Sequence, residues 1–225
     1  MSETRERARR GAREFSCADC VGRPCRSNDV AKFPSYCLTA HVDPQRLQES
    51  LEKYDDKDMG HMARVCASVE SDFYCRLNRV AETIEFIKRM QYREVGIATC
   101  VGLMPEARLF SGLLQASGIS HYTVGCKIGA MDKTTIGIPE NQKLNGGDGH
   151  ESMCNPVMQA MVLNDRKTDF NILIGLCVGH DSLFIQHSRA PVSVMIVKDR
   201  VLGHNPVAAL YNVGGMYSSF KEIGK

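Results

Sequence analysis

The stretch that decides the expected fold is FNILIGLCVGHDSLFIQHSRAPVSVMIVK, residues 170–198. Two apolar runs of strand length, residues 170–177 and 192–198, enclose a segment from about 181 to 189 that is typical of a helix. Two neighbouring strands joined by a helix run parallel, and the crossover between them is right-handed. The stretch therefore predicts one β-α-β unit of a parallel sheet.

The same alternation extends toward the N-terminus. Apolar strands are expected at residues 94–100 and 121–126, with a helix over 105–117 between them and another beginning near Asn155-Pro156. A last short helix is expected near Asn205-Pro206. The pattern predicts an α/β fold with a mostly parallel, Rossmann-like sheet flanked by helices. In such sheets, ligands bind at the edge where the strands end.

The chain of 225 residues is expected to have four parts. Its helical segment begins at Asp43-Pro44, where an N-cap residue precedes a proline that suits the first helical position. The expected parts are a basic flexible tail (1–14), a cysteine-rich metal-binding module (15–42), a helical segment packed on the core (43–92) and the α/β domain (93–225).

Composition narrows the class of protein. With 43% apolar residues and a net charge of +2, the chain is neither collagen-like nor wholly disordered, and binding to nucleic acid is not expected. It contains no secretory signal and no apolar run of membrane-spanning length, which favours a cytoplasmic protein that does not enter a membrane. In that compartment its ten cysteines indicate metal, iron–sulfur or redox chemistry rather than a disulfide framework.

A first cysteine group lies in the irregular segment before residue 43. Cys17, Cys20, Cys25 and Cys37 follow the spacing C-x2-C-x4-C-x11-C, and a two-residue gap lets one turn present two thiolates to a metal. Four thiolates suit either a tetrahedral zinc ion or an iron–sulfur cluster, and this spacing does not distinguish the two. The alternative is four unrelated free or buried cysteines.

A second group is indicated by a repeated pattern. Residues 97–102 and 174–179 both read I-x-x-C-V-G, which places Cys100 and Cys177 between a strand and a helix. Amides at a helix start favour the thiolate form of cysteine. Cys126 ends another expected strand and Cys154 precedes a helix, so up to four cysteines gather on one edge and suit a [4Fe–4S] cluster with an open iron position. The alternative is that these are small apolar residues buried at strand ends.

Polar neighbours supply the candidate catalytic groups. His180 and Asp181 directly follow the second C-V-G turn, where His180 suits an acid or base and Asp181 equally suits an N-cap. The role of the glycine-rich segment 127–151 is left open. No dinucleotide-binding, P-loop or serine-nucleophile motif is present.

The chain also resembles a known family. The segments GLCVGHDSLF (175–184), VKDRV (197–201) and GHNP (203–206), together with the four N-terminal cysteines, are similar to the family called domain of unknown function 1847. Its members are often described as uncharacterised metal-binding proteins. The resemblance covers essentially the whole chain. It implies a metal site, usually taken as zinc, at Cys17, Cys20, Cys25 and Cys37. It implies no particular reaction.

Three functional hypotheses follow. The first is a metal-binding protein with a four-cysteine zinc or iron–sulfur site and a second cysteine-ligated cluster that supports redox or sulfur-transfer chemistry. The second is a non-enzymatic α/β binding module with structural zinc, and the third is a thiol redox sensor. The expected partners are metal ions and either a small-molecule ligand or a redox partner. The sequence leaves open whether the chain is an enzyme.

Overall fold

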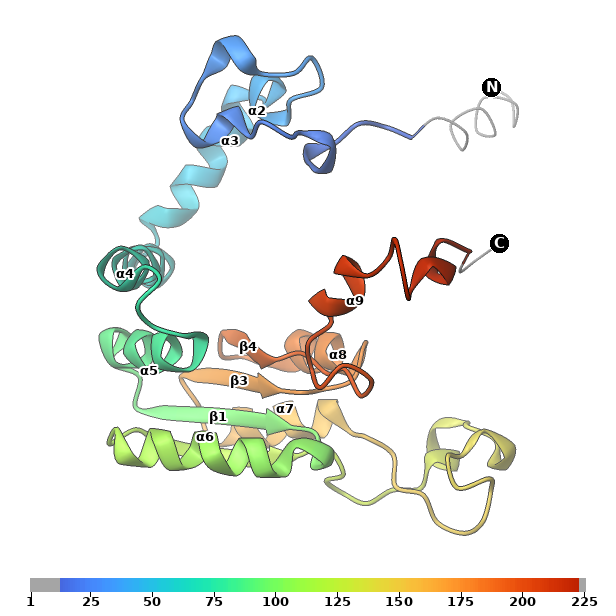
Figure 1. The fold of residues 1–225 in the computed structure, drawn as a ribbon. Coiled ribbons are helices and arrows are strands. Elements are labelled where there is room, and N and C mark those ends of the chain that lie inside the picture. Colours follow the sequence, from blue (N-terminus) through green and yellow to red (C-terminus); the bar gives the residue numbers. More distant parts are fainter. Residues whose placement is uncertain (1–12, 223–225) are drawn as a thin grey trace. The chain divides into compact units, whose positions relative to one another are not determined.

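The fold is built around one parallel sheet. A computed structural model describes residues 13–222 of the chain (Figure 1). All four strands run parallel, in the order β2-β1-β3-β4. The strands are β1 (Glu94–Thr99), β2 (Ser120–Gly125), β3 (Phe170–Ile174) and β4 (Val192–Ile196). The predicted α/β fold with a parallel sheet is therefore confirmed.

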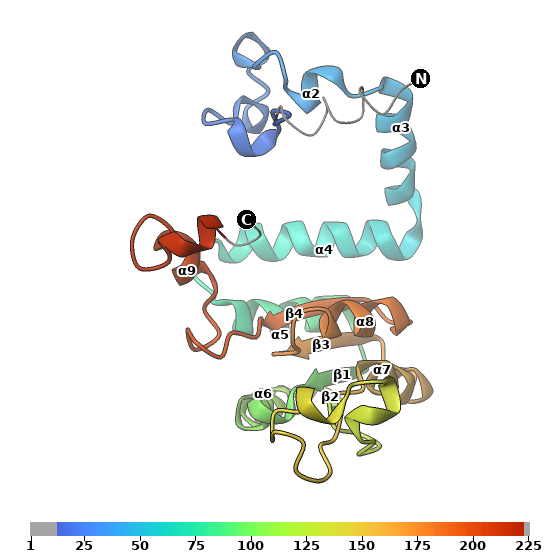
Figure 2. The same ribbon diagram turned by 90° about the vertical axis from the view of Figure 1, so that its right-hand side faces the viewer.

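Helices cover both faces of this sheet. In Figure 2, α5 and α6 lie on one side of the strands, and α7 and α8 lie together on the other side. This arrangement follows from right-handed crossovers, because the chain steps from β1 to β2 in one direction and then back past β1 to β3 and β4. The helices are α5 (Arg79–Met90), α6 (Met104–Ala116), α7 (Pro156–Asp165), α8 (His180–His187) and the short C-terminal α9 (Val207–Tyr211).

The core lies on the two central strands. Every residue of β3 is buried, as is every residue of β1 after Glu94, which explains why both strands are mainly apolar, with Asn171 and Thr99 as buried polar exceptions. Ile97 and Ile172 pair across the two strands and are fully buried, and Ile87 of α5 and Leu163 of α7 are buried in the same apolar cluster. A core of this kind fixes the point along the sheet at which each strand ends. It therefore also positions the residues that follow each strand.

Two predicted strand ends are wrong: β4 ends at Ile196 instead of Lys198, and β3 ends earlier still relative to its prediction. The sequence predicts a strand through Cys177, but β3 ends at Ile174. Gly175 turns the chain away with a φ of +66°, and a Cβ there would lie 2.4 Å from Leu103 Cδ2. Because Thr99 pairs with Ile174, Cys177 lies two residues further beyond its strand than Cys100 does. The two I-x-x-C-V-G segments are therefore not structurally equivalent.

The chain divides into two compact units, with the division between Arg64 and Val65. The unit before the division contains short 3-10 helices around the first cysteine group, and α3 begins at Pro44 after the Asp43 cap, as predicted. Residues 1–12, most of the predicted basic tail, lie outside the described part of the chain. The helices of this part are α2 (Leu38–His41), α3 (Pro44–Glu52) and α4 (Lys57–Phe73), and α4 contains the division.

Between residues 13 and 222, no helix combines the length and the apolar character needed to cross a membrane.

Candidate thiol site at the carboxyl edge of the sheet

Three cysteines come from three segments that meet where β1 and β2 end. Cys100 follows Thr99 of β1 and Cys126 follows Gly125 of β2, and Thr99 and Gly125 are paired neighbours in the sheet. Cys154 precedes the Asn155 cap of α7. The amide of Asn155 donates a 2.7 Å hydrogen bond to the carbonyl of Cys126, which fixes the start of α7 against the end of β2.

The three thiols form a connected series. Cys126 lies in the middle, close enough to Cys154 and to Cys100 for hydrogen bonding between the thiols to shift their pKa values. Its sulfur also accepts a 3.4 Å hydrogen bond from the amide of Val101. Cys100 and Cys126 are buried, whereas Cys154 is partly exposed. The site therefore offers one thiol to solvent and keeps two behind it.

The two thiols at the exposed end have opposite acidities. The hydrogen bond from Cys126, together with the nearby charges of Lys127 and His180, lowers the pKa of Cys154 to about 5 despite partial burial. The same hydrogen bond, together with burial, raises the pKa of Cys126. Near neutral pH, Cys154 is consequently a thiolate that accepts a hydrogen bond from the protonated thiol of Cys126.

Cys100 has its own cationic partner. Burial opposes its ionisation, but the Lys198 amine lies 2.8 Å from its sulfur and the Gly102 amide donates to it at 3.4 Å. Together these contacts lower the pKa of Cys100. Lys198 follows β4, which ends at Ile196, so this contact again joins residues that follow strand ends.

Cys177 makes a different contact. Its sulfur accepts a 3.0 Å hydrogen bond from the Arg200 guanidinium, and its carbonyl accepts hydrogen bonds from the amides of His180 and Asp181. The early end of β3 thus directs Cys177 toward the segment after β4. Of the two predicted catalytic residues, His180 lies near enough to Cys154 to affect its pKa, while the Asp181 carboxylate accepts a hydrogen bond from the amide of Ser182. Gly179, rather than Asp181, occupies the N-cap position of α8.

Gln159 ties the thiol segments together and was not predicted. Its side-chain amide donates to the carbonyls of Thr99 and Val124, at 3.1 and 2.7 Å, just before Cys100 and Cys126. Gln159 is fully buried on α7, the helix that follows Cys154. A polar residue on the buried face of an apolar helix was the available signal, since Pro156, Ala160 and Leu163 share that face.

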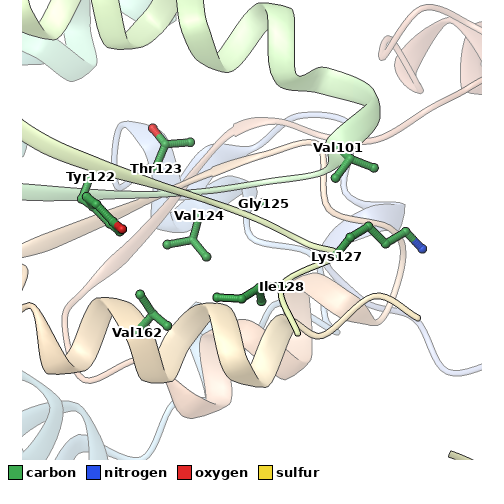
Figure 3. Close-up of a pocket in the computed structure, with 8 residues that line it drawn as sticks. All are labelled: Val101, Tyr122, Thr123, Val124, Gly125, Lys127, Ile128 and Val162. Atoms are coloured by element: carbon green, nitrogen blue, oxygen red, sulfur yellow. The ribbon is translucent and has the colours of Figure 1, made fainter. Parts of the chain in front are cut away.

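A pocket of about 310 Å³ lies beside this edge (Figure 3). In the close-up, Val124, Ile128 and Val162 form its apolar part, and Lys127 extends at the end near Val101. The residues on either side of Cys126 in the chain, Gly125 and Lys127, both belong to its wall. The Lys127 amine donates a 2.5 Å hydrogen bond to the carbonyl of Ser152, which holds the approach to Cys154.

The segment from Lys127 to Met153 is a loop that connects Cys126 to Cys154 along the chain. At its centre the nearly buried Lys143 amine lies 3.0 Å from the Asp132 carboxylate and 2.6 Å from that of Glu140. Backbone hydrogen bonds from Thr134 and Glu151, with Lys143, hold the pKa of Asp132 well below its usual range. Glu151 in turn pairs with Lys133. The 127–151 loop is thus fixed by charge contacts and has little apolar packing.

The described residues contain no ready-made metal site. Between residues 13 and 222, no three histidine, cysteine, aspartate or glutamate side chains are grouped so as to hold one ion. In the first cysteine group, all four thiols are free, and Cys20 and Cys37 both lie near the Tyr36 hydroxyl. The predicted ligands of both sites are therefore placed, but no metal geometry is defined by them.

The fold and the site define an α/β protein with a cluster of thiols at the carboxyl edge of a parallel sheet. The chain belongs to the family described as protein of unknown function (DUF1847), which matches residues 37–195. It is 42% identical over 164 residues to an uncharacterized protein of Methanocaldococcus jannaschii, a match that covers 73% of this chain and 82% of the relative. The matched family range includes the cysteines of the sheet edge and excludes Cys17, Cys20 and Cys25.

Proposed function

We propose that the carboxyl edge of the sheet is a thiol redox centre in which Cys154 is the attacking thiolate and Cys126 the resolving thiol. The observation that carries this proposal is that the two thiols lie side by side, Cys154 partly exposed and with a lowered pKa, Cys126 buried and with a raised pKa. An attacking thiol needs access and thiolate character, and a resolving thiol must be adjacent and must ionise before it attacks in turn. Cys100, held by Lys198, is a third thiol within reach of Cys126.

The reaction is thiol–disulfide exchange with a small disulfide. The Cys154 thiolate attacks one sulfur of the substrate, so a mixed disulfide forms and one substrate thiolate leaves. Cys126 then loses its proton to that first substrate thiolate and, as a thiolate, attacks the Cys154 sulfur, which releases the second substrate thiolate. The substrate disulfide gains two electrons and yields one thiolate and one thiol, while the protein gains the Cys126–Cys154 disulfide. The cytoplasm, where thiols are kept reduced, is the compartment in which the resting dithiol form would persist.

Oxidation of the intact chain tests this function. The reduced protein is treated with a small excess of 2-hydroxyethyl disulfide, and its peptides are mapped by mass spectrometry without reduction. The expected product is a Cys126–Cys154 linked peptide. Cys154→Ser removes all reaction at this site, and Cys126→Ser stops it at the mixed disulfide. Cys66→Ser, an exposed cysteine on α4, is the matched control and should behave as wild type. Random pairing among the exposed cysteines would contradict the proposal.

A second function is favoured for the first cysteine group: binding of zinc or an iron–sulfur cluster by Cys17, Cys20, Cys25 and Cys37. The supporting observation is that Cys20 and Cys37, far apart in sequence, both lie close enough to the Tyr36 hydroxyl to raise its pKa, after the larger effect of burial. Both therefore border one small volume, beside a pocket of about 390 Å³ that includes Cys20 and Tyr36. With Cys17 and Cys25 drawn in, four thiolates would form a donor set that suits both zinc and iron–sulfur clusters.

Metal analysis of the full chain after anaerobic purification tests this second function. One zinc per chain, or iron with acid-labile sulfide and absorption near 400 nm, is expected, and Cys17→Ser/Cys20→Ser should remove it. Cys66→Ser/Cys75→Ser is the matched control with two exposed thiols lost elsewhere. The same measurement on Cys100→Ser/Cys177→Ser tests the [4Fe–4S] cluster predicted for the sheet edge. A metal-free chain that stays fully folded would rule out both sites.

A further inference from the structure

Basic side chains from three segments lie beside the thiols of the sheet edge. Lys127 follows β2, His180 begins α8, and Lys198 and Arg200 follow β4. Three of these side chains donate hydrogen bonds to sulfur or to a backbone carbonyl: Lys198 to Cys100, Arg200 to Cys177, and Lys127 to Ser152. All four thus follow a strand or begin a helix at the carboxyl edge of the sheet, and Lys127 and His180 lie near Cys154 itself.

These charges are not balanced by carboxylates. Among the side chains that the structure describes, no aspartate or glutamate forms an ion pair with Lys127, Lys198 or Arg200. The nearest acidic residues in sequence are engaged locally: Asp181 accepts from the amide of Ser182, and Asp199 accepts from those of Val201 and Leu202. By contrast, the lysines of the adjoining loop pair with Asp132, Glu140 and Glu151.

We infer that the substrate of this site is a small disulfide that carries carboxylate or sulfonate groups, held by Arg200 and the neighbouring cations. The inference rests on the proposed thiol exchange and names its substrate class. Unbalanced positive charge at a cleft raises the local concentration of anions and their rate of encounter. A guanidinium also holds a carboxylate through two parallel hydrogen bonds, which orients it. Arg200 is exposed, so it is accessible to such a group.

Replacement of Arg200 tests the recognition of substrate charge without changing the activation of the Cys154 thiol. Lys127 lowers the pKa of Cys154, so its removal would alter both the nucleophile and the binding of an anion. Arg200 contacts Cys177, which takes no part in the proposed exchange. Arg189→Gln is the matched control, because Arg189 lies between α8 and β4, at the edge where β4 begins, away from the thiols.

The test uses three alkyl disulfides that differ in charge: 3,3′-dithiodipropionate (anionic), 2-hydroxyethyl disulfide (neutral) and cystamine (cationic). The rate of Cys126–Cys154 disulfide formation in the full chain is measured for each at low salt, and each rate is divided by that of 1-thioglycerol, a neutral thiol, with the same disulfide. The normalised rate is expected to be on the order of tenfold higher for the anionic than for the cationic disulfide. Salt and Arg200→Gln should each reduce this ratio severalfold, and Arg189→Gln should leave it unchanged.

The outcomes separate the two proposals. Equal normalised rates for the three disulfides, or an anion preference that survives Arg200→Gln, would overturn the substrate class while leaving the redox pair intact. Absence of the Cys126–Cys154 disulfide with all three reagents would instead overturn the proposed function itself.

Discussion

Cys126 and Cys154 lie side by side at the carboxyl edge of the sheet, and the interaction between their thiols is the largest cause that moves their pKa values in opposite directions. Cys126 is buried and Cys154 is partly exposed, so the proton stays on the thiol that substrates cannot reach. Two cysteines of identical chemistry thereby acquire different roles through their positions, one at the end of β2 and the other before α7.

The first prediction concerns the acidity of Cys154. The rate of its alkylation by iodoacetamide, followed by peptide mass spectrometry, should rise with pH to half its maximum near pH 5, because the pKa of Cys154 is about 5. In Cys126→Ala the midpoint should move up, since the largest stabilising contact of the thiolate is lost. Cys66 in the same sample is the internal reference. A midpoint in Cys126→Ala equal to that of wild type would show that the hydrogen bond does not control the acidity.

The second prediction concerns stability and pH. The pKa of Cys154 in the folded protein is about 5, below the value of about 8.5 for an unfolded cysteine. The thiolate therefore contributes stability that is fully present above the unfolded pKa and is lost as the pH falls through the folded one. The raised pKa of Cys126 has the opposite sign, so its contribution is lost as the pH rises above the unfolded value.

Urea unfolding of wild type and Cys154→Ser measures this effect. The excess stability of wild type should shrink steadily as the pH is lowered from about 8 to about 5. A difference between the two proteins that does not change over that range would contradict the low pKa.

The third prediction concerns the turn after β3. Gly175→Ala should lower the free energy of unfolding by about 1–3 kcal/mol, because the residue has a positive φ and the new methyl group meets Leu103. Gly112→Ala is the matched control: it lies inside α6, and nothing is within 4 Å of a Cβ placed there. Since alanine is the better helix former by about 0.5–1 kcal/mol, this control should be neutral or slightly stabilising in the same urea titration.

The fourth prediction concerns Gln159. Replacement by leucine removes two hydrogen bonds and leaves the carbonyls of Thr99 and Val124 without this donor, which should cost about 1–3 kcal/mol of stability. The exposed Gln115 of α6 is the control, and Gln115→Leu should change stability by less than about 0.5 kcal/mol. The rate of Cys154 alkylation measures the effect of Gln159→Leu on the thiol site, separately from its effect on stability. Unchanged stability in Gln159→Leu would show that the two contacts are not needed to hold the segments together.

Much of the fold could be predicted because its signals are local. The runs that became β1 and β3 are mainly apolar because both strands are buried on both faces, and the Asn155-Pro156 pair marks the start of α7 through capping alone. Parallel topology then places the residues that follow each strand on one edge. That rule was sufficient to bring Cys100 and Cys126 into one prediction, to which Cys154 was added because it precedes a helix.

The rest of the site depends on packing distances between segments, which local sequence patterns do not predict. Cys177 was expected beside Cys100 because their segments read alike, but the packing of Leu103 against Gly175 ends β3 early and turns Cys177 toward Arg200. Lys198 and Arg200 follow β4 and could have been found by the same strand-end rule. Which cation would contact which sulfur depends on the irregular pairing of β3 with β4 near Leu173 and Ile174, which no local pattern predicts.

The loop from Lys127 to Met153 has a consequence for how the oxidation state can be read. The proposed disulfide partners are the residues immediately before and after it, so their oxidation would close this segment into a covalent ring. A single protease cut inside the loop would then leave one molecule when the pair is oxidised and two separable fragments when it is reduced. The number of separable fragments would thereby report the redox state, and a denaturing gel without reductant would show it directly.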